Sequence, residues 1–133
     1  MNKIFISREL HNFGRYSPND PLRYIHPYKT DALKKILENI PDWVEFIVIY
    51  GSSVSDYQTE ESDLDLAVIP RDESFAFQKI IRGLKLPVKV DMQSFESLDD
   101  LLSQAEELFA TPRDIVRAGV PVYAKGFNIS AQI

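Results

Sequence analysis

Residues 44–50, with the sequence VEFIVIY, restrict the fold of this chain more than any other segment. They are rich in aromatic and β-branched side chains and lack the three-to-four-residue period of a helix, which is typical of a strand buried on both faces. Such a strand needs other layers above and below it. Gly51 follows directly and ends the predicted strand.

Further strands are indicated by other patterns. Residues 64–69, LDLAVI, are largely apolar, and a short last strand is predicted at residues 120–123. Residues 88–94 alternate strictly: Val88, Val90 and Met92 share one parity, and Lys89, Asp91 and Gln93 share the other. Because side chains point to opposite faces in turn along a strand, we expect one face of this strand to meet the core and the other to meet solvent.

Apolar residues recur at helical spacing between these strands. A first helix is predicted from Thr30, its N-cap, and Pro41 stops it. A second helix ends near Gly83 and Pro87. Their apolar stripes are Leu33, Ile36, Leu37 and Ile40 in the first helix, and Phe77, Ile80, Ile81 and Leu84 in the second.

Two more helices are indicated by capping signals. Ser97 and Asp100 resemble a capping box, in which the two residues close the first turn of a helix reciprocally. Thr111 is expected to cap a short helix with Pro112 at its first position, and Gly119 to close it.

Helices and strands in this order predict an α/β (α+β) fold with a mixed β-sheet flanked by helices. The length of 133 residues suits one domain and leaves little room for a second core. We assign the domain to residues 30–125. Residues 1–29, rich in proline and without a period, are predicted to form an irregular N-terminal arm, and residues 126–133 a C-terminal tail.

The composition argues against several classes of function. Without cysteine, the chain has no disulfide, thiolate metal site or thiol nucleophile, which fits a reducing compartment, so we expect cytoplasmic localisation. Neither a signal peptide nor an apolar run long enough for a membrane span is indicated. The 15 Lys and Arg are scattered and the net charge is −5, which argues against a nucleic-acid partner.

The turn after the first strand has the residues of a phosphate cradle. Gly51 has no Cβ, so its backbone can turn sharply and approach a phosphate closely, and Ser52 adds a hydroxyl. If the following segment is helical, its free N–H groups would also point at an anion.

Three aspartates form a candidate metal site. Asp63 and Asp65 are two residues apart at the second strand, so their carboxylates are expected to project from the same face. If the third strand lies beside the second, Asp91 adds another carboxylate at the same end of the sheet. Magnesium binds carboxylate and phosphate oxygens together, and a pair of such ions can catalyse phosphoryl transfer.

The spacing of these residues is similar to that of a known family. Gly51-Ser52, nine intervening residues, the run SDLDL at 62–66 and the later Asp91 resemble the signature of minimal nucleotidyltransferases of the DNA polymerase beta-like superfamily. The resemblance implies the polymerase beta-like nucleotidyltransferase fold and covers roughly residues 30–123.

What the family resemblance implies about the site is specific. Gly51 and Ser52 would contact the triphosphate of a nucleoside triphosphate, Asp63 and Asp65 would bind two Mg²⁺ ions, and Asp91 would be a metal ligand that assists the incoming hydroxyl. Short family members resemble the antitoxin of two-component toxin–antitoxin pairs, which implies a helical partner protein of the HEPN type. Related folds adenylylate aminoglycosides, but usually carry an extra helical domain for the drug.

A second class of function stays open. Asp56 occupies the place of a second glycine of the pattern, and residues 53–55 lack the arginine often found there. Both features favour a non-catalytic module that binds a nucleotide or a protein without turnover. The three aspartates favour the enzyme.

Overall fold

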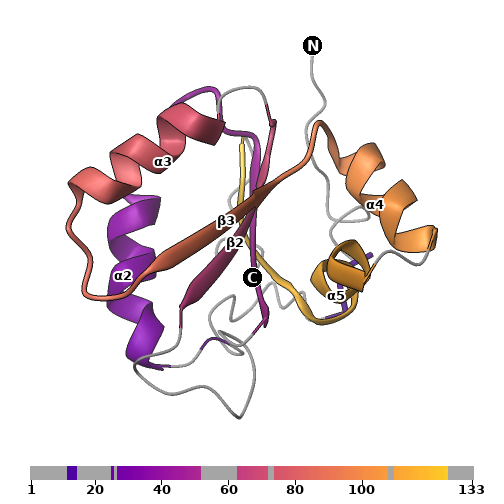
Figure 1. Ribbon diagram of the computed structural model, residues 1–133, viewed down its shortest axis with the longest axis horizontal. Helices are drawn as coiled ribbons and strands as arrows, with labels where there is room; N and C mark the ends of the chain where they lie inside the picture. The colour runs from indigo at the N-terminus through magenta and orange to yellow at the C-terminus, as the bar shows by residue number, and fades with distance from the viewer. Residues whose placement is uncertain are drawn as a thin grey trace.

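The architecture is a mixed four-stranded sheet between two pairs of helices (Figure 1). The computed structural model describes residues 12–14, 25, 27–51, 63–71, 74–107 and 110–125, and these counts refer to that part of the chain. The helices α2 and α3 cover one face of the sheet, and α4 and α5 cover the other. The elements, in chain order, are α2 (Pro27–Leu37), β1 (Phe46–Tyr50), β2 (Leu64–Ile69), α3 (Ser74–Gly83), β3 (Val90–Ser94), α4 (Leu98–Glu106), α5 (Ala110–Ala118) and β4 (Val120–Ala124).

The strand order is β3-β2-β1-β4, with β1 antiparallel to both β2 and β4 and with β3 parallel to β2. This confirms the predicted mixed sheet flanked by helices. Tyr50, the last residue of β1, pairs with Asp65, and Asp65 pairs in turn with Asp91. The end of β1 and the beginnings of β2 and β3 therefore share one end of the sheet.

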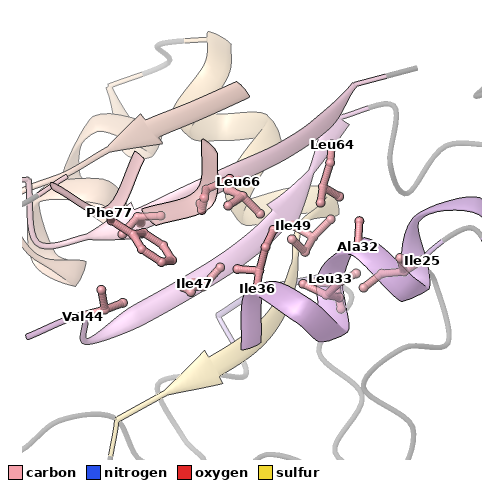
Figure 2. Close-up of a cluster of buried hydrophobic side chains, with 13 residues drawn as sticks. Ile25, Ala32, Leu33, Ile36, Val44, Ile47, Ile49, Leu64, Leu66 and Phe77 are labelled. Atoms are coloured by element: carbon pink, nitrogen blue, oxygen red, sulfur yellow. The ribbon is translucent and has the colours of Figure 1, made fainter. Parts of the chain in front are cut away.

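The core has two layers because β1 is buried on both faces, as its sequence predicts. Ile47 and Ile49 face α2 and α3, whereas Phe46, Val48 and Tyr50 belong to the cluster under α4 and α5. Figure 2 shows the first layer, in which Leu33 and Ile36 of α2 lie against β1 and Phe77 comes from α3.

Helix α3 is apolar over a narrower stripe than its sequence suggests. Phe77 and Ile81 are buried, but Ile80 is 38% exposed. The spacing of Ile80 places it beside Phe77 and Ile81 along the helix, but it lies at the border of the buried face.

Two helix starts differ from the prediction. Helix α2 begins at Pro27 rather than after Thr30, since proline fits the first helical position, where no N–H partner is needed. Helix α5 begins at Ala110, so Thr111 lies inside the helix and does not cap it. Pro112 is still within the first turn, where its missing N–H leaves no hydrogen bond unmade.

Parts of the segment predicted as an irregular arm pack against the core. Phe13 is 2% exposed, and its ring centroid lies 5.5 Å from that of Phe46. The Gly14 N–H donates to the carbonyl of Val116 at 2.9 Å. Ile25 is buried in the layer under α2.

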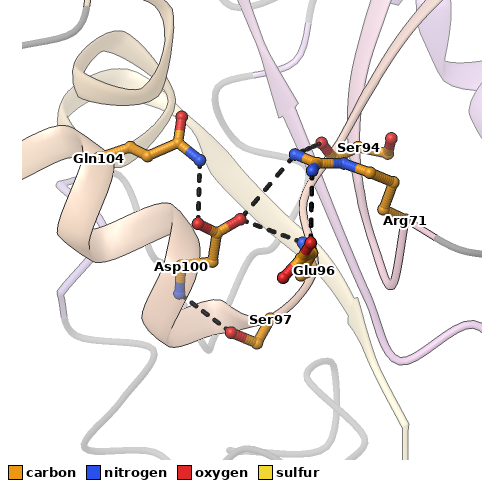
Figure 3. A network of polar contacts seen from close by, with 6 residues as sticks. All are labelled: Arg71, Ser94, Glu96, Ser97, Asp100 and Gln104. Carbon is orange, nitrogen blue, oxygen red and sulfur yellow. Dashed lines mark hydrogen bonds and ion pairs between the residues drawn. The ribbon is translucent and has the colours of Figure 1, made fainter.

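The start of α4 is held by the capping interaction that its sequence predicts (Figure 3). Ser97 is the N-cap, and its Oγ accepts from the Asp100 N–H at 3.0 Å. The Asp100 carboxylate accepts from the Glu96 N–H, one residue before the cap, at 3.2 Å, and from Gln104 Nε2 at 3.0 Å. Arg71, which follows β2, lies 3.9 Å from Asp100 and 3.7 Å from Glu96.

These contacts predict how stability responds to pH. The hydrogen bonds from Gln104 and the Glu96 N–H, with the charge of Arg71, hold the pKa of Asp100 below its usual value. A lowered folded-state pKa stabilises the fold above the unfolded pKa of about 3.9, and this contribution is lost as the pH falls through the folded-state value. We therefore expect Asp100→Asn to be less stable than the parent at neutral pH, with the difference shrinking in acid.

Urea unfolding of the two proteins at several pH values measures this difference. Ser97→Ala is the matched control: it should cost about 1 kcal/mol without the same pH dependence, because serine does not titrate. A difference between Asp100→Asn and the parent that persists below pH 3 would contradict the assignment.

Candidate active site

Asp65 and Asp91 are brought together by the parallel pairing of β2 and β3. They are direct partners in the register, so both lie on the same face of the sheet. Asp65 is half-buried on a strand with neighbours on both sides, whereas Asp91 is exposed on β3, the last strand of the described sheet. Neighbouring strands are about 4.8 Å apart, so the two side chains start from adjacent positions.

Asp63 joins this pair from the residue just before β2. A hydrogen bond between the side chains of Asp63 and Asp91, together with burial and the negative charge of Asp63, raises the pKa of Asp91, and Lys89 opposes the shift. Two carboxyl groups that share a hydrogen bond without a cation repel each other when both are ionised, so one proton is retained more strongly.

Gly51 is in direct contact with this cluster. Its φ of +70° is in the left-handed region that favours glycine. A Cβ added there would lie 2.5 Å from Oδ2 of Asp65, much closer than any real contact. The backbone of the predicted phosphate turn therefore passes immediately beside one of the predicted metal ligands, and only glycine leaves room for that carboxylate.

Tyr50 belongs to the site although the sequence analysis did not single it out. It is 9% exposed, and burial together with the charges of Asp65 and Asp91 raises its pKa to about 12. The phenol therefore stays protonated at neutral pH, next to carboxylates. The available signal was its place directly before Gly51, but only the antiparallel register shows that it faces Asp65.

The donor set suits a hard cation, since its ligands would all be carboxylate oxygens. As the side chains stand, no group of three His, Cys, Asp or Glu in the described ranges is arranged around a possible metal position. Asp63 is paired with Asp91, and Asp65 lies against Gly51. The chemistry of the residues fits magnesium, while a closed coordination shell would need rearranged side chains and further oxygen ligands.

Ser52 and Asp56 lie outside the described residues, so the predicted contact of Ser52 with phosphate stays a prediction. The same holds for the effect of Asp56 on the turn.

A mixed sheet that carries aspartates on neighbouring strands at one end, beside a glycine turn, defines the class of nucleotidyltransferase folds. The chain belongs to the polymerase beta nucleotidyltransferase family, because the model of that family matches residues 31–125. No curated protein matches the chain. None of the helices in the described part is long and apolar enough to cross a membrane.

Proposed function

We propose that this protein transfers a nucleoside monophosphate from a magnesium-bound nucleoside triphosphate, most simply ATP, to a hydroxyl group, with release of pyrophosphate. The observation that carries the proposal is the meeting of Asp63, Asp65 and Asp91 at one end of the sheet beside Gly51. Membership of the polymerase beta nucleotidyltransferase family supports the same reaction class.

Each residue has a role in this proposal. Asp63 and Asp65 hold two Mg²⁺ ions together with triphosphate oxygens. The bound ions supply charge neutralisation and Lewis acidity at the phosphates. Asp91 also contributes to the metal site, and it takes the proton of the acceptor hydroxyl. Gly51 and Ser52 bring their backbone close to the triphosphate.

The acceptor is proposed to be a hydroxyl on another protein. Short members of the family that this chain resembles act as antitoxins beside a helical partner of the HEPN type, and a domain of this size has little room to hold an acceptor by itself. The runner-up function is a module that binds nucleotide or protein without turnover, favoured by Asp56 in the place of a glycine.

Magnesium-dependent nucleotide binding tests the site. Titration with a non-hydrolysable triphosphate should give saturable binding with Mg²⁺ and none with EDTA, since the carboxylates alone repel the phosphates. In a lysate, label should move to protein from α-labelled triphosphate but not from γ-labelled triphosphate, which distinguishes nucleotidyl from phosphoryl transfer. Binding without label transfer from either position would favour the non-catalytic module, and no binding at millimolar nucleotide would overturn both proposals.

A further inference from the structure

A cavity of about 520 Å³ lies between the end of α3 and β3. Its apolar lining comes mainly from Ile81 of α3 and from Val90 and Met92 of β3, which face α3. Asp91 lines the same cavity. A molecule in this cavity would therefore touch the strand that carries the carboxylate assigned to the acceptor hydroxyl.

The charge of this cavity is opposite to that of the chain. Arg82, Lys85 and Lys89 line it, and Asp91 is its single lining carboxylate, although the chain as a whole carries −5. All three cations are exposed, and the ion pairs printed by the described geometry involve Arg71 instead. A negative group could approach these cations without displacing a carboxylate partner in the described ranges.

Lys85 occupies a position that suits glycine better. Its φ of 53° is in the left-handed region, two residues after the end of α3. A lysine there is strained relative to glycine. Strain that persists where the side chain lines a cavity is consistent with a use for that side chain.

The backbone of β3 offers a second feature. It is the last strand of the described sheet, so in that part of the chain its outer edge has no strand partner. An exposed strand edge can pair with an extended peptide through main-chain hydrogen bonds. Nucleic acid is a poor match, because a long polyanion would also meet the net negative charge of the whole domain.

We propose that the α3–β3 cavity and the outer edge of β3 form the acceptor site, and that the acceptor is an extended acidic peptide segment carrying the modified hydroxyl. This inference rests on the proposed function. In the reaction, the acceptor oxygen bonds to the α-phosphorus, the bond from that phosphorus to the bridging oxygen breaks, pyrophosphate leaves, and the hydroxyl proton passes to Asp91.

The alternation of strands adds a sequence rule. Along β3, Asp91 projects from one face of the sheet, while Val90 and Met92 project toward α3. A peptide strand beside β3 alternates in the same way. The residue with the hydroxyl therefore faces Asp91, and its immediate neighbours face α3, where Arg82 and Lys85 select glutamate or aspartate.

Peptide binding tests this site without nucleotide. The probes are two short peptides with a central tyrosine or serine, flanked on both sides by glutamates in one peptide and by lysines in the other. The glutamate peptide should bind at least about tenfold more tightly, and amide shifts in NMR spectra should fall on residues 82–92. Equal binding of the two peptides, or shifts elsewhere, would overturn the proposal.

Charge reversal has a matched control in the chain. Arg82→Glu with Lys85→Glu should lower kcat/KM for the glutamate peptide by about tenfold or more, and should improve the lysine peptide. Lys34→Glu with Lys35→Glu makes the same change of net charge near the end of α2, away from the cavity, and should leave kcat/KM unchanged. An equal loss in both double variants would mean that only net charge matters, and would overturn the site.

Lys85→Gly separates the role of the side chain from that of the fold. It removes the backbone strain, so Tm should rise, while affinity for the glutamate peptide should fall. A rise in Tm with unchanged affinity would assign Lys85 no part in binding.

The failures of the two proposals can be distinguished. Magnesium-dependent nucleotide binding without preference for the glutamate peptide overturns the acceptor site alone. Peptide binding without nucleotide binding overturns the transferase and its acceptor role, and leaves a docking surface. Transfer to a 3′-hydroxyl oligonucleotide in preference to the glutamate peptide also overturns the acceptor assignment.

Discussion

Replacing Asp65 with asparagine is expected to lower nucleotidyl transfer on the order of a thousandfold, with the fold intact. Asparagine keeps the shape of the side chain and removes the charge that would bind the cation. A metal ion contributes several kcal/mol of transition-state stabilisation, and each 1.36 kcal/mol is a factor of ten in rate. Asp65 is half-buried at the beginning of β2, so the variant should fold normally.

Thermal unfolding provides an independent readout of the same variant. Three carboxylates meet at this end of the sheet, so removing one charge should leave Tm unchanged or raise it when Mg²⁺ is absent. Asp114→Asn is the control, because Asp114 is exposed on α5, and it should retain full transfer and nucleotide binding. If Asp65→Asn kept transfer within tenfold of the parent, the carboxylates would not form the catalytic metal site.

Replacing Gly51 with alanine is the second change with a large expected effect. The new Cβ would lie 2.5 Å from Oδ2 of Asp65, and the residue would keep a φ of +70° only with strain. The backbone cost is about 1–2 kcal/mol. Either the turn or the Asp65 carboxylate has to move, so we expect magnesium-dependent nucleotide binding to fall at least about a hundredfold, which is about 2.7 kcal/mol.

Gly83→Ala is the matched control for this substitution. A Cβ on Gly83, the last residue of α3, meets no atom within 4 Å. Alanine favours the helix over glycine, so the control should be about 0.5–1 kcal/mol more stable than the parent and bind nucleotide normally. Urea unfolding and nucleotide titration of both variants measure the two effects. Normal nucleotide binding by Gly51→Ala would show that the close approach to Asp65 has no function.

The sequence was sufficient to predict those features that depend on local pattern. The unbroken apolar run of β1 indicated burial on both faces, and the alternation in β3 indicated that Asp91 lies on a polar face. The capping of α4 by Ser97 was also visible, since it spans only three residues. These properties follow from backbone periodicity and neighbouring side chains, which a sequence contains directly.

Features that depend on the pairing of distant segments could not be predicted in the same way. A buried tyrosine at the end of a strand has the same sequence signal whether it faces carboxylates or the core, and the β1–β2 register decides this for Tyr50. Phe13 lies in a stretch without period, so its packing against Phe46 has no local signature. The cations of the α3–β3 cavity are likewise adjacent only because β3 returns alongside α3.

The different positions of Asp65 and Asp91 in the sheet have an evolutionary consequence. Asp65 lies on an interior strand, held between β1 and β3, so most substitutions around it would disturb packing and nucleotide chemistry together. Asp91 lies on a boundary strand whose outer side and neighbouring helix end are exposed. Related proteins could therefore diverge in the molecules they modify by changing surface residues such as Arg82 and Lys85, while the chemistry of transfer is inherited unchanged.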